Sequence, residues 1–176
     1  MKNPHVHELL ARMNEALVST VARKQLSQPL MVGIHTGGAW VADHLHKGLD
    51  LADPLGLLDI SFYRDDFSRI GMNPSVKPST LPLSIDNRHI ILVDDVLYTG
   101  RTVRAALNEL FDYGRPASVL LAVLIDREGR ELPIQADVVG QELDLAGRKH
   151  IKLIGPDPLA LSIVDAKFST QQDPRV

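Results

Sequence analysis

The sequence predicts a single α/β domain in which helices cover both faces of a largely parallel sheet. Its 176 residues suffice for one compact domain with a core of its own. Continuous apolar runs at 90–93 and 118–125 are typical of strands buried on both sides. A helical pattern lies between these runs, and strand–helix–strand order with short turns predicts parallel strands.

Two helices and one strand are predicted within the first 50 residues. Apolar residues recur at helical spacing between Val6 and Val21 and predict an amphipathic helix. The apolar stretch 29–34 predicts a short buried strand, which ends at a His-Thr-Gly-Gly turn. The pattern of 39–49 predicts a second helix that ends near Gly48. The order is therefore helix, strand, loop, helix.

A long polar segment follows the next predicted strand. Alternating apolar and polar residues predict that strand within 55–63. The connection after it is longer than most loops inside a compact domain, and such loops are usually functional or mobile. For residues of about 64–82 we therefore consider both a lid over a site and a plain surface hairpin.

The last third of the chain changes character after the apolar run at 118–125. A helix is expected before this run and ends near Gly114. Short strands and turns are expected from Asp126 onward, and residues 151–165 predict a terminal hairpin. The last eight residues, 169–176, are expected to form a loose tail.

The composition excludes several classes of function. The absence of cysteine leaves no disulfide, thiol nucleophile or zinc–thiolate site. The apolar runs are too short to span a bilayer and the N-terminus has no hydrophobic signal core, so we expect a cytoplasmic protein without a membrane association. With a net charge of -3, any binding of nucleic acid must depend on a local basic patch.

Two adjacent carboxylates, Asp94 and Asp95, stand at the end of an apolar strand and are followed by a turn rich in hydroxyls. In an open parallel sheet, ligands bind beyond the carboxyl ends of strands, and the amides at the next helix start attract phosphate. The turn Tyr98–Thr102 suits phosphate, whereas two carboxylates need hydroxyl groups or a metal ion. The stretch therefore predicts a sugar-phosphate site. The alternative is a strand end with Thr99 as helix cap and both acids in water.

The stretch from Ile90 to Thr102 resembles the phosphoribosyl-diphosphate signature of type I phosphoribosyltransferases. Three further motifs are Tyr-Arg-Asp-Asp at 63–66, Gly-Arg-Pro at 114–116 and Arg-Glu-Leu-Pro-Ile at 130–134. With these motifs the chain is similar to the pyrimidine operon regulator and uracil phosphoribosyltransferase family, PyrR.

The resemblance runs from about Met31 to Gly140 and implies the type I phosphoribosyltransferase fold. This fold is a single domain with a central, largely parallel sheet between helices. The resemblance also implies a small hood at about 126–145, over the base, and a flexible hairpin lid at about 64–82. A phosphoribosyltransferase needs such a lid, because the sugar becomes oxocarbenium-like during the transfer and water would capture it in an open site.

The resemblance also implies the roles of individual residues. Asp94 and Asp95 are expected to hold the ribose hydroxyls, and both are expected to act in catalysis with Arg64 and Asp65 of the lid. The expected 5′-phosphate ligands are Tyr98, Thr99, Gly100, Arg101 and Thr102, and the expected diphosphate ligands are Thr36, Gly37 and Gly38. The family usually has an arginine where Gly37 stands, so that one diphosphate contact is missing here. Mg²⁺ is expected to arrive mainly with the substrate diphosphate, without a dedicated set of protein ligands.

The activity that the resemblance implies is transfer of the ribosyl phosphate of phosphoribosyl diphosphate (PRPP) to uracil, which yields UMP and diphosphate. It implies in addition that pyrimidine mRNA (pyr mRNA) is bound, more tightly with UMP or UTP, to regulate pyrimidine genes. The resemblance and the apolar first helix suggest a homodimer or a higher homo-oligomer. Another base specificity within the superfamily is disfavoured by the motifs and is not excluded by the physical argument.

RNA binding has weaker support in the sequence than sugar-phosphate binding. RNA recognition requires clustered basic residues. The candidates are Arg12, Arg23, Lys24, Arg148, Lys149, His150 and Lys152. Gln135 and Gln141 stand where the common family pattern has positive charges, which weakens contacts to phosphate. Two alternatives stay open: a nucleotide sensor without significant transferase activity, and a phosphoribosyltransferase that binds no RNA.

Overall fold

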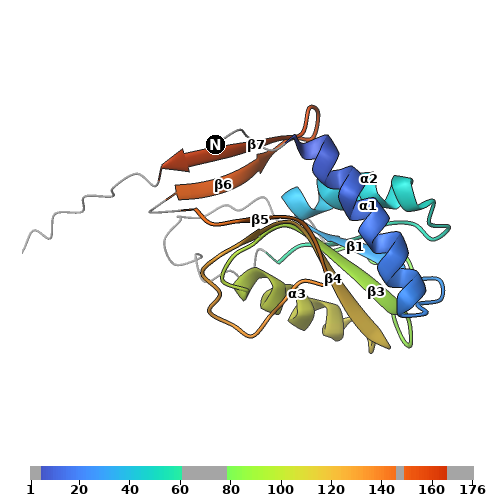
Figure 1. The fold of residues 1–176 in the computed structure, drawn as a ribbon. Coiled ribbons are helices and arrows are strands. Elements are labelled where there is room, and N and C mark those ends of the chain that lie inside the picture. The colour runs from blue at the N-terminus through green and yellow to red at the C-terminus, as the bar shows by residue number, and fades with distance from the viewer. Residues whose placement is uncertain (1–4, 61–78, 146–148, 166–176) are drawn as a thin grey trace, which may run out of the picture.

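A five-stranded parallel sheet is the centre of the protein (Figure 1). The computed structural model describes residues 5–60, 79–145 and 149–165. The order across the sheet is β2-β1-β3-β4-β5, and each neighbouring pair is parallel. The strands are β1 (Leu30–Ile34), β2 (Gly56–Leu58), β3 (His89–Leu97), β4 (Ser118–Arg127) and β5 (Val138–Leu143). An antiparallel hairpin of β6 (Lys149–Ile154) and β7 (Ala160–Asp165) forms a second, smaller sheet.

Helices cover both faces of the sheet, as the sequence predicts (Figure 1). The first helix, α1 (Val6–Arg23), packs on β4, β5 and α2, and α2 (Gly37–Leu49) packs on β1 and β3. The third helix, α3 (Arg101–Asp112), contacts β2 and β3 and belongs to a second core cluster. Because the strands are buried on both sides, they consist of nearly continuous apolar residues.

The chain reverses its direction of travel across the sheet between β1 and β3. From β1 it moves outward to β2, and from β3 it moves in the opposite direction to β4 and β5. The helix after β1 therefore lies on one face and the helix after β3 lies on the other. Such a switch point leaves a crevice beyond the carboxyl ends of the two strands, where ligands bind in open α/β sheets.

Three element boundaries differ from those expected. β3 continues through Asp94 and Asp95 to Leu97. The two acids therefore lie within the last residues of the strand, which are still paired with β4, and not after its end. α2 begins two residues earlier than expected, at Gly37, and β2 has only three residues. Residues 64–78 of the expected lid lie outside the described residues. After them, Thr80 forms an isolated antiparallel bridge with Leu57.

The apolar face of α1 lies inside the chain's own core. Leu9, Met13 and Leu17 are completely buried in the cluster shared with α2 and the sheet. Val18, at 57% exposure, is an apolar residue of this helix that remains on the surface. Burial against the sheet accounts for the amphipathic pattern, so the pattern carries no information on oligomeric state, which stays a prediction.

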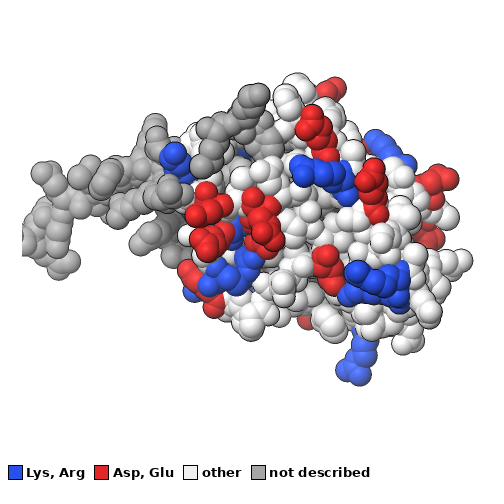
Figure 2. Space-filling view, viewed as in Figure 1, with Lys and Arg blue, Asp and Glu red and all other residues white. Residues whose placement is uncertain are grey.

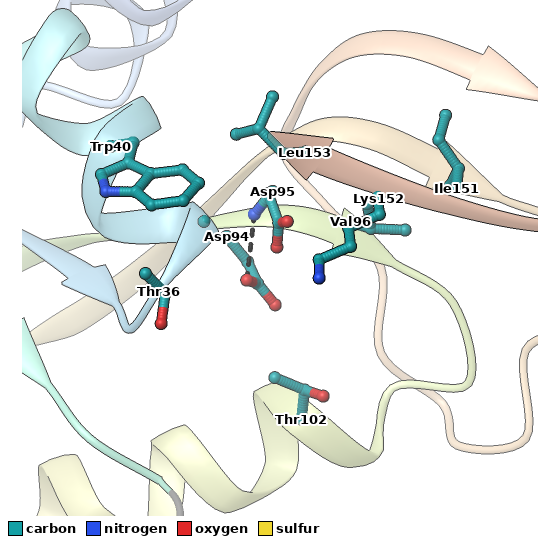
Figure 3. A pocket seen from close by; sticks show the side chains of 10 residues that line it. Thr36, Trp40, Asp94, Asp95, Val96, Thr102, Ile151, Lys152 and Leu153 are labelled. Carbon is teal, nitrogen blue, oxygen red and sulfur yellow. Dashed lines mark hydrogen bonds between the residues drawn. The ribbon is translucent and has the colours of Figure 1, made fainter. Parts of the chain in front are cut away.

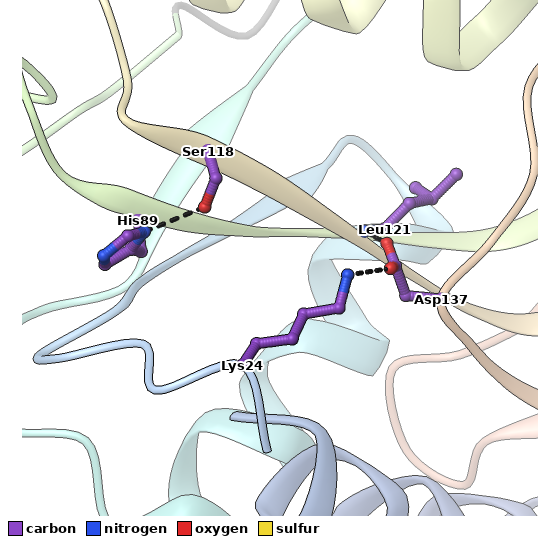
Figure 4. A network of polar contacts seen from close by, with 5 residues as sticks. All are labelled: Lys24, His89, Ser118, Leu121 and Asp137. Carbon is purple, nitrogen blue, oxygen red and sulfur yellow. Dashed lines mark hydrogen bonds and ion pairs between the residues drawn. The ribbon is translucent and has the colours of Figure 1, made fainter. Parts of the chain in front are cut away.

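Asp137 connects the end of α1 to the middle of the sheet (Figure 4). Its carboxylate accepts hydrogen bonds from the Leu121 amide at 3.0 Å and from Lys24 Nζ at 2.6 Å. The Asp137 amide donates to the Leu121 carbonyl at 2.8 Å. Asp137 thus satisfies a backbone amide at the point where β5 begins beside β4.

We expect Asp137→Ala to lower the free energy of unfolding by about 1–3 kcal/mol, because it leaves the Leu121 amide without its partner. Lys24→Met is the matched control and should cost less than about 1 kcal/mol, since the ion pair is partly exposed. Urea unfolding followed by circular dichroism measures both. Equal losses of unfolding free energy in the two variants would show that the hydrogen bond to the Leu121 amide contributes no more than the ion pair with Lys24.

Candidate functional site

A cavity of about 500 Å³ lies at the switch point of the sheet (Figure 3). Its wall combines the start of α2, the end of β3, the start of α3 and the middle of β6. The lining residues are Thr36, Gly37, Trp40, Asp94, Asp95, Val96, Thr102, Ile151, Lys152 and Leu153. The structure therefore brings together residues from the two loops that the sequence analysis singled out.

The first turns of two helices open toward this cavity. Thr36, the N-cap residue of α2, forms no side-chain cap hydrogen bond among the described residues, and Gly100, the N-cap residue of α3, has a left-handed conformation. Thr36 and Thr102 both line the cavity. Free amides and the positive end of the helix dipole make each start a place for an anion. Two such starts in one cavity suit a ligand that carries two anionic groups.

Asp94 and Asp95 lie between these two helix starts (Figure 3). Asp94 is only 4% exposed, and its Oδ1 accepts a hydrogen bond from the Asp95 amide at 2.9 Å. Asp95 is half-buried. Two carboxylates repel phosphate but accept hydrogen bonds from hydroxyl groups. The arrangement suits a ribose whose hydroxyls face the acids while its anionic groups face the helix starts.

Gly37 allows α2 to approach β3 closely. A Cβ atom added at this position would lie 2.2 Å from Oδ2 of Asp95 and 2.5 Å from its Cγ. Any larger residue, including the arginine that the resemblance leads one to expect, would have to displace the Asp95 carboxylate. The glycine is therefore part of the geometry that holds this acid in the cavity.

The expected 5′-phosphate residues take different positions. Thr102 lines the cavity, whereas Tyr98 and Arg101 point elsewhere. Arg101 Nε donates to Glu131 Oε2 at 2.8 Å, so its charge is shared with an acid in this state. Thr99 Oγ1 accepts from the Arg101 amide at 3.2 Å. The N-cap residue of α3 is nevertheless Gly100, with no side-chain cap hydrogen bond, so the alternative with Thr99 as the helix cap is not what the structure shows. The two acids line a cavity.

The sequence analysis missed the wall that β6 contributes. Figure 3 shows Lys152 directed toward the two aspartates, while Ile151 and Leu153 point away to the other side of β6. Lys152 is the one lysine or arginine that lines the cavity within the described ranges. The alternation of apolar residues along 151–153 predicts a strand face for Lys152, but it does not reveal which site the strand faces.

Trp40 and Val96 provide an apolar part of the same cavity. Trp40 packs against the core and also contacts Gly155 beyond β6, where an added Cβ would lie 2.8 Å from its ring. Val96 lies on β3 directly after the acids. These two side chains give the cavity an apolar wall, which suits the face of a planar ring.

Several expected residues cannot be compared with the structure. Arg64, Asp65, Arg148 and the tail at 169–176 lie outside the described residues. Of the basic candidates that are described, Arg12, Arg23 and Lys149 are exposed. Lys24 is bound to Asp137. Figure 2 shows basic and acidic side chains interspersed over one face of the molecule.

Residues 126–134, within the predicted hood, contact the 5′-phosphate turn. The amides of Glu131 and Leu132 donate to the carbonyl of Thr99 at 3.0 and 3.1 Å. In contrast, β6, all of which lies beyond the predicted bounds of the hood, forms a wall of the cavity. The hood over the base stays a prediction.

In the described ranges, no group of three or more His, Cys, Asp or Glu side chains could hold a metal ion. None of the helices in the same ranges is long and apolar enough to cross a bilayer.

Known proteins resemble this chain over most of its length. Residues 4–156 match the phosphoribosyl transferase domain family. Bifunctional protein PyrR of Nitrosococcus oceani is 62% identical over 161 residues, which cover 90% of this chain and 91% of the relative. Bifunctional protein PyrR of Pseudomonas aeruginosa is 57% identical over 161 residues, which cover 92% of this chain and 95% of the relative.

Solved structures agree with the fold. Hypoxanthine phosphoribosyl transferase of Trypanosoma cruzi superimposes with a TM-score of 0.60 at 25% identity, over 80% of this chain and 76% of that one. Its likeness confirms the type I phosphoribosyltransferase fold predicted from the sequence. The chain therefore belongs to the phosphoribosyltransferase family, and within it to the PyrR proteins.

Proposed function

We propose that the protein is a bifunctional pyrimidine regulator and uracil phosphoribosyltransferase, which converts uracil and PRPP to UMP and diphosphate. The observation that carries the proposal is the pair Asp94 and Asp95 between two helix starts in one cavity. PRPP has two hydroxyls between two anionic ends, which matches acids between amide clusters. Membership in the PyrR family supports uracil as the base.

In this proposal the chain binds PRPP in three parts. The start of α2 at Thr36, Gly37 and Gly38 binds the diphosphate, and the turn Tyr98–Thr102 binds the 5′-phosphate. Asp94 and Asp95 accept hydrogen bonds from the ribose hydroxyls and leave C1 between the two ends. Mg²⁺ enters as part of the substrate, bound to its diphosphate. The two aspartates then face an ion-bearing substrate and not a bare polyanion.

Catalysis is proposed to depend on orientation and electrostatics. When the diphosphate leaves C1, positive charge develops on the sugar, and the nearby carboxylates of Asp94 and Asp95 stabilise it. Trp40 and Val96 hold the base on the apolar side of the cavity, where the nitrogen that attacks C1 is positioned. Arg64 and Asp65 of the proposed lid would close the site and meet the diphosphate charge.

Asp94→Asn and Asp95→Asn test the role of the acids. We expect each to lower kcat/KM for UMP formation by about 100-fold or more, because a neutral amide cannot stabilise the sugar cation equally. The assay follows UMP formation from uracil and PRPP with Mg²⁺. Asp43→Asn, on the exposed side of α2 in a surface pair with Lys47, is the matched control and should leave activity unchanged. A native chain that binds PRPP without turnover would instead favour the nucleotide-sensor function.

Lys152→Met tests whether the cation of β6 serves the substrate. The cavity holds two acids and, in the described ranges, this single lysine, so we expect its ammonium to bind an anionic part of PRPP. KM for PRPP should rise about ten-fold, with a smaller change in kcat. Lys47→Met, at an exposed position on α2, is the charge-matched control. An unchanged KM for PRPP would show that Lys152 does not contact the substrate.

The regulatory half of the proposal is binding of pyr mRNA, tightened by UMP or UTP. The name of the relatives, bifunctional protein PyrR, supports it. Arg12, Arg23 and Lys149 are exposed and available for RNA phosphates, whereas Lys24 already binds Asp137. We propose a homodimer or higher homo-oligomer, which would place two such surfaces on one assembly.

Filter binding of pyr mRNA with the double variant Arg12→Gln/Arg23→Gln tests this half. Each lost phosphate contact should weaken binding and lower the salt dependence, by about one unit of slope per contact. Lys24→Met should have a smaller effect because its charge is paired within the chain. If the native chain binds no RNA with or without UMP, the protein is a phosphoribosyltransferase without RNA binding.

A further inference from the structure

The connection between β4 and β5 holds the 5′-phosphate turn by several independent contacts. Besides the two amides that donate to Thr99, the Arg130 guanidinium donates to the Tyr98 carbonyl and to the Asp126 carboxylate. Glu131 accepts from Arg101, as described above. The turn is therefore fixed from outside the cavity by one short segment, and the backbone and the side chains of that segment both contribute.

Arg127 is the most unusual residue of this segment. It is only 8% exposed, and its guanidinium carbon lies 4.0 Å from the centroid of the Tyr98 ring. Its Nε has no hydrogen-bond partner among the described residues, and within the same ranges it forms no ion pair. The edge of the same ring lies against Gly129, where a Cβ would come within 2.4 Å of Cε2.

Burial of an unpaired guanidinium is unfavourable unless another group compensates the charge. The face of the Tyr98 ring compensates part of this cost, because the electron-rich face of an aromatic ring attracts a cation. The coupling acts in both directions. Arg127 holds the ring in place, and the ring is the direct contact of the Arg127 guanidinium among the described residues.

The space beside Arg127 does not suit an anionic ligand of its own. A cavity at this place is lined by Arg127 and Arg130, but also by Asp126, Glu128, Glu142 and Asp144. The acids outnumber the bases, and Arg130 is already bound to Asp126. A phosphate would meet net repulsion there, so the buried cation acts on Tyr98 rather than on a ligand in this second cavity.

We propose that Arg127 is a positioning residue, which fixes Tyr98 and thereby orients the amides of the 5′-phosphate turn. The proposal rests on the proposed function of this turn as the 5′-phosphate site. Tyr98 is the first residue of the turn, and its side chain is 40% exposed. Without Arg127, the ring would keep its contact with Gly129 but would have no group over its face. Amides bind phosphate well only when they are oriented in advance, and loss of the contact would lower affinity for the phosphate end of the ligand.

Binding of UMP and of uridine, measured by calorimetry on the full chain, separates this role from general damage. The two ligands differ only in the 5′-phosphate. Arg127→Gln should weaken UMP binding about ten-fold while uridine binding stays unchanged, and Arg127→Lys, which retains a cation over the ring, should restore most of the loss. In UMP formation the variant should raise KM for PRPP and change kcat much less. Arg115→Gln, ahead of the opposite end of β4, is the control and should behave as the native chain.

A double-mutant cycle with Tyr98→Leu tests the contact itself. If the two side chains act through each other, Arg127→Gln/Tyr98→Leu should weaken UMP binding no more than either single change. Additive losses would overturn the proposal, as would an equal loss of UMP and uridine binding or an unchanged UMP affinity in Arg127→Gln. A native chain that binds UMP no more tightly than uridine would overturn the 5′-phosphate site itself, which is a different failure.

Discussion

The parallel pairing of β1 with β3 is the constraint on which the site depends. The register that aligns Gly33 with Val93 brings the ends of both strands to one edge of the sheet. The chain then leaves β1 into α2 on one face and β3 into α3 on the other. Both helix starts consequently meet over the same crevice, with Asp94 and Asp95 between them. A shift of one residue in this register would turn the acids away from the crevice, because side chains alternate along a strand.

This arrangement solves an electrostatic problem that a negatively charged ligand creates. Two carboxylates in a cavity repel a polyanion, but here they lie between helix starts whose amides carry partial positive charge. In the proposed function, the anionic ends of a sugar phosphate face amides while its hydroxyls face acids. Cationic side chains act from the periphery: Lys152 from β6, and Arg127 through the ring of Tyr98. Gly37 lets α2 lie close to β3, because the missing side chain leaves room for the Asp95 carboxylate.

The sequence predicted those parts of the fold and site that are local in the chain. The helical spacing of Leu9, Met13 and Leu17 predicts α1 because the same side chains that repeat in sequence are buried together. Asp94 and Asp95 could be recognised because strand, acids and turn are contiguous. Lys152 could not, since it reaches the cavity only because β6 packs against β3. The pairing of Arg101 with Glu131, 30 residues apart, is likewise a consequence of tertiary structure.

A pocket of this design also connects catalysis with regulation, if UMP binds as proposed. UMP keeps the 5′-phosphate and both hydroxyls of PRPP and lacks the diphosphate, so it uses two of the three contact sets that the substrate uses. The enzyme therefore retains affinity for its own product, and a nucleotide held in this way can act as an effector. Coupling is reciprocal: RNA affinity can change with UMP only as far as RNA changes the affinity for UMP. Residues that set the affinity for the 5′-phosphate, such as Arg127, then set both the product release of the enzyme and the nucleotide concentration to which the regulator responds.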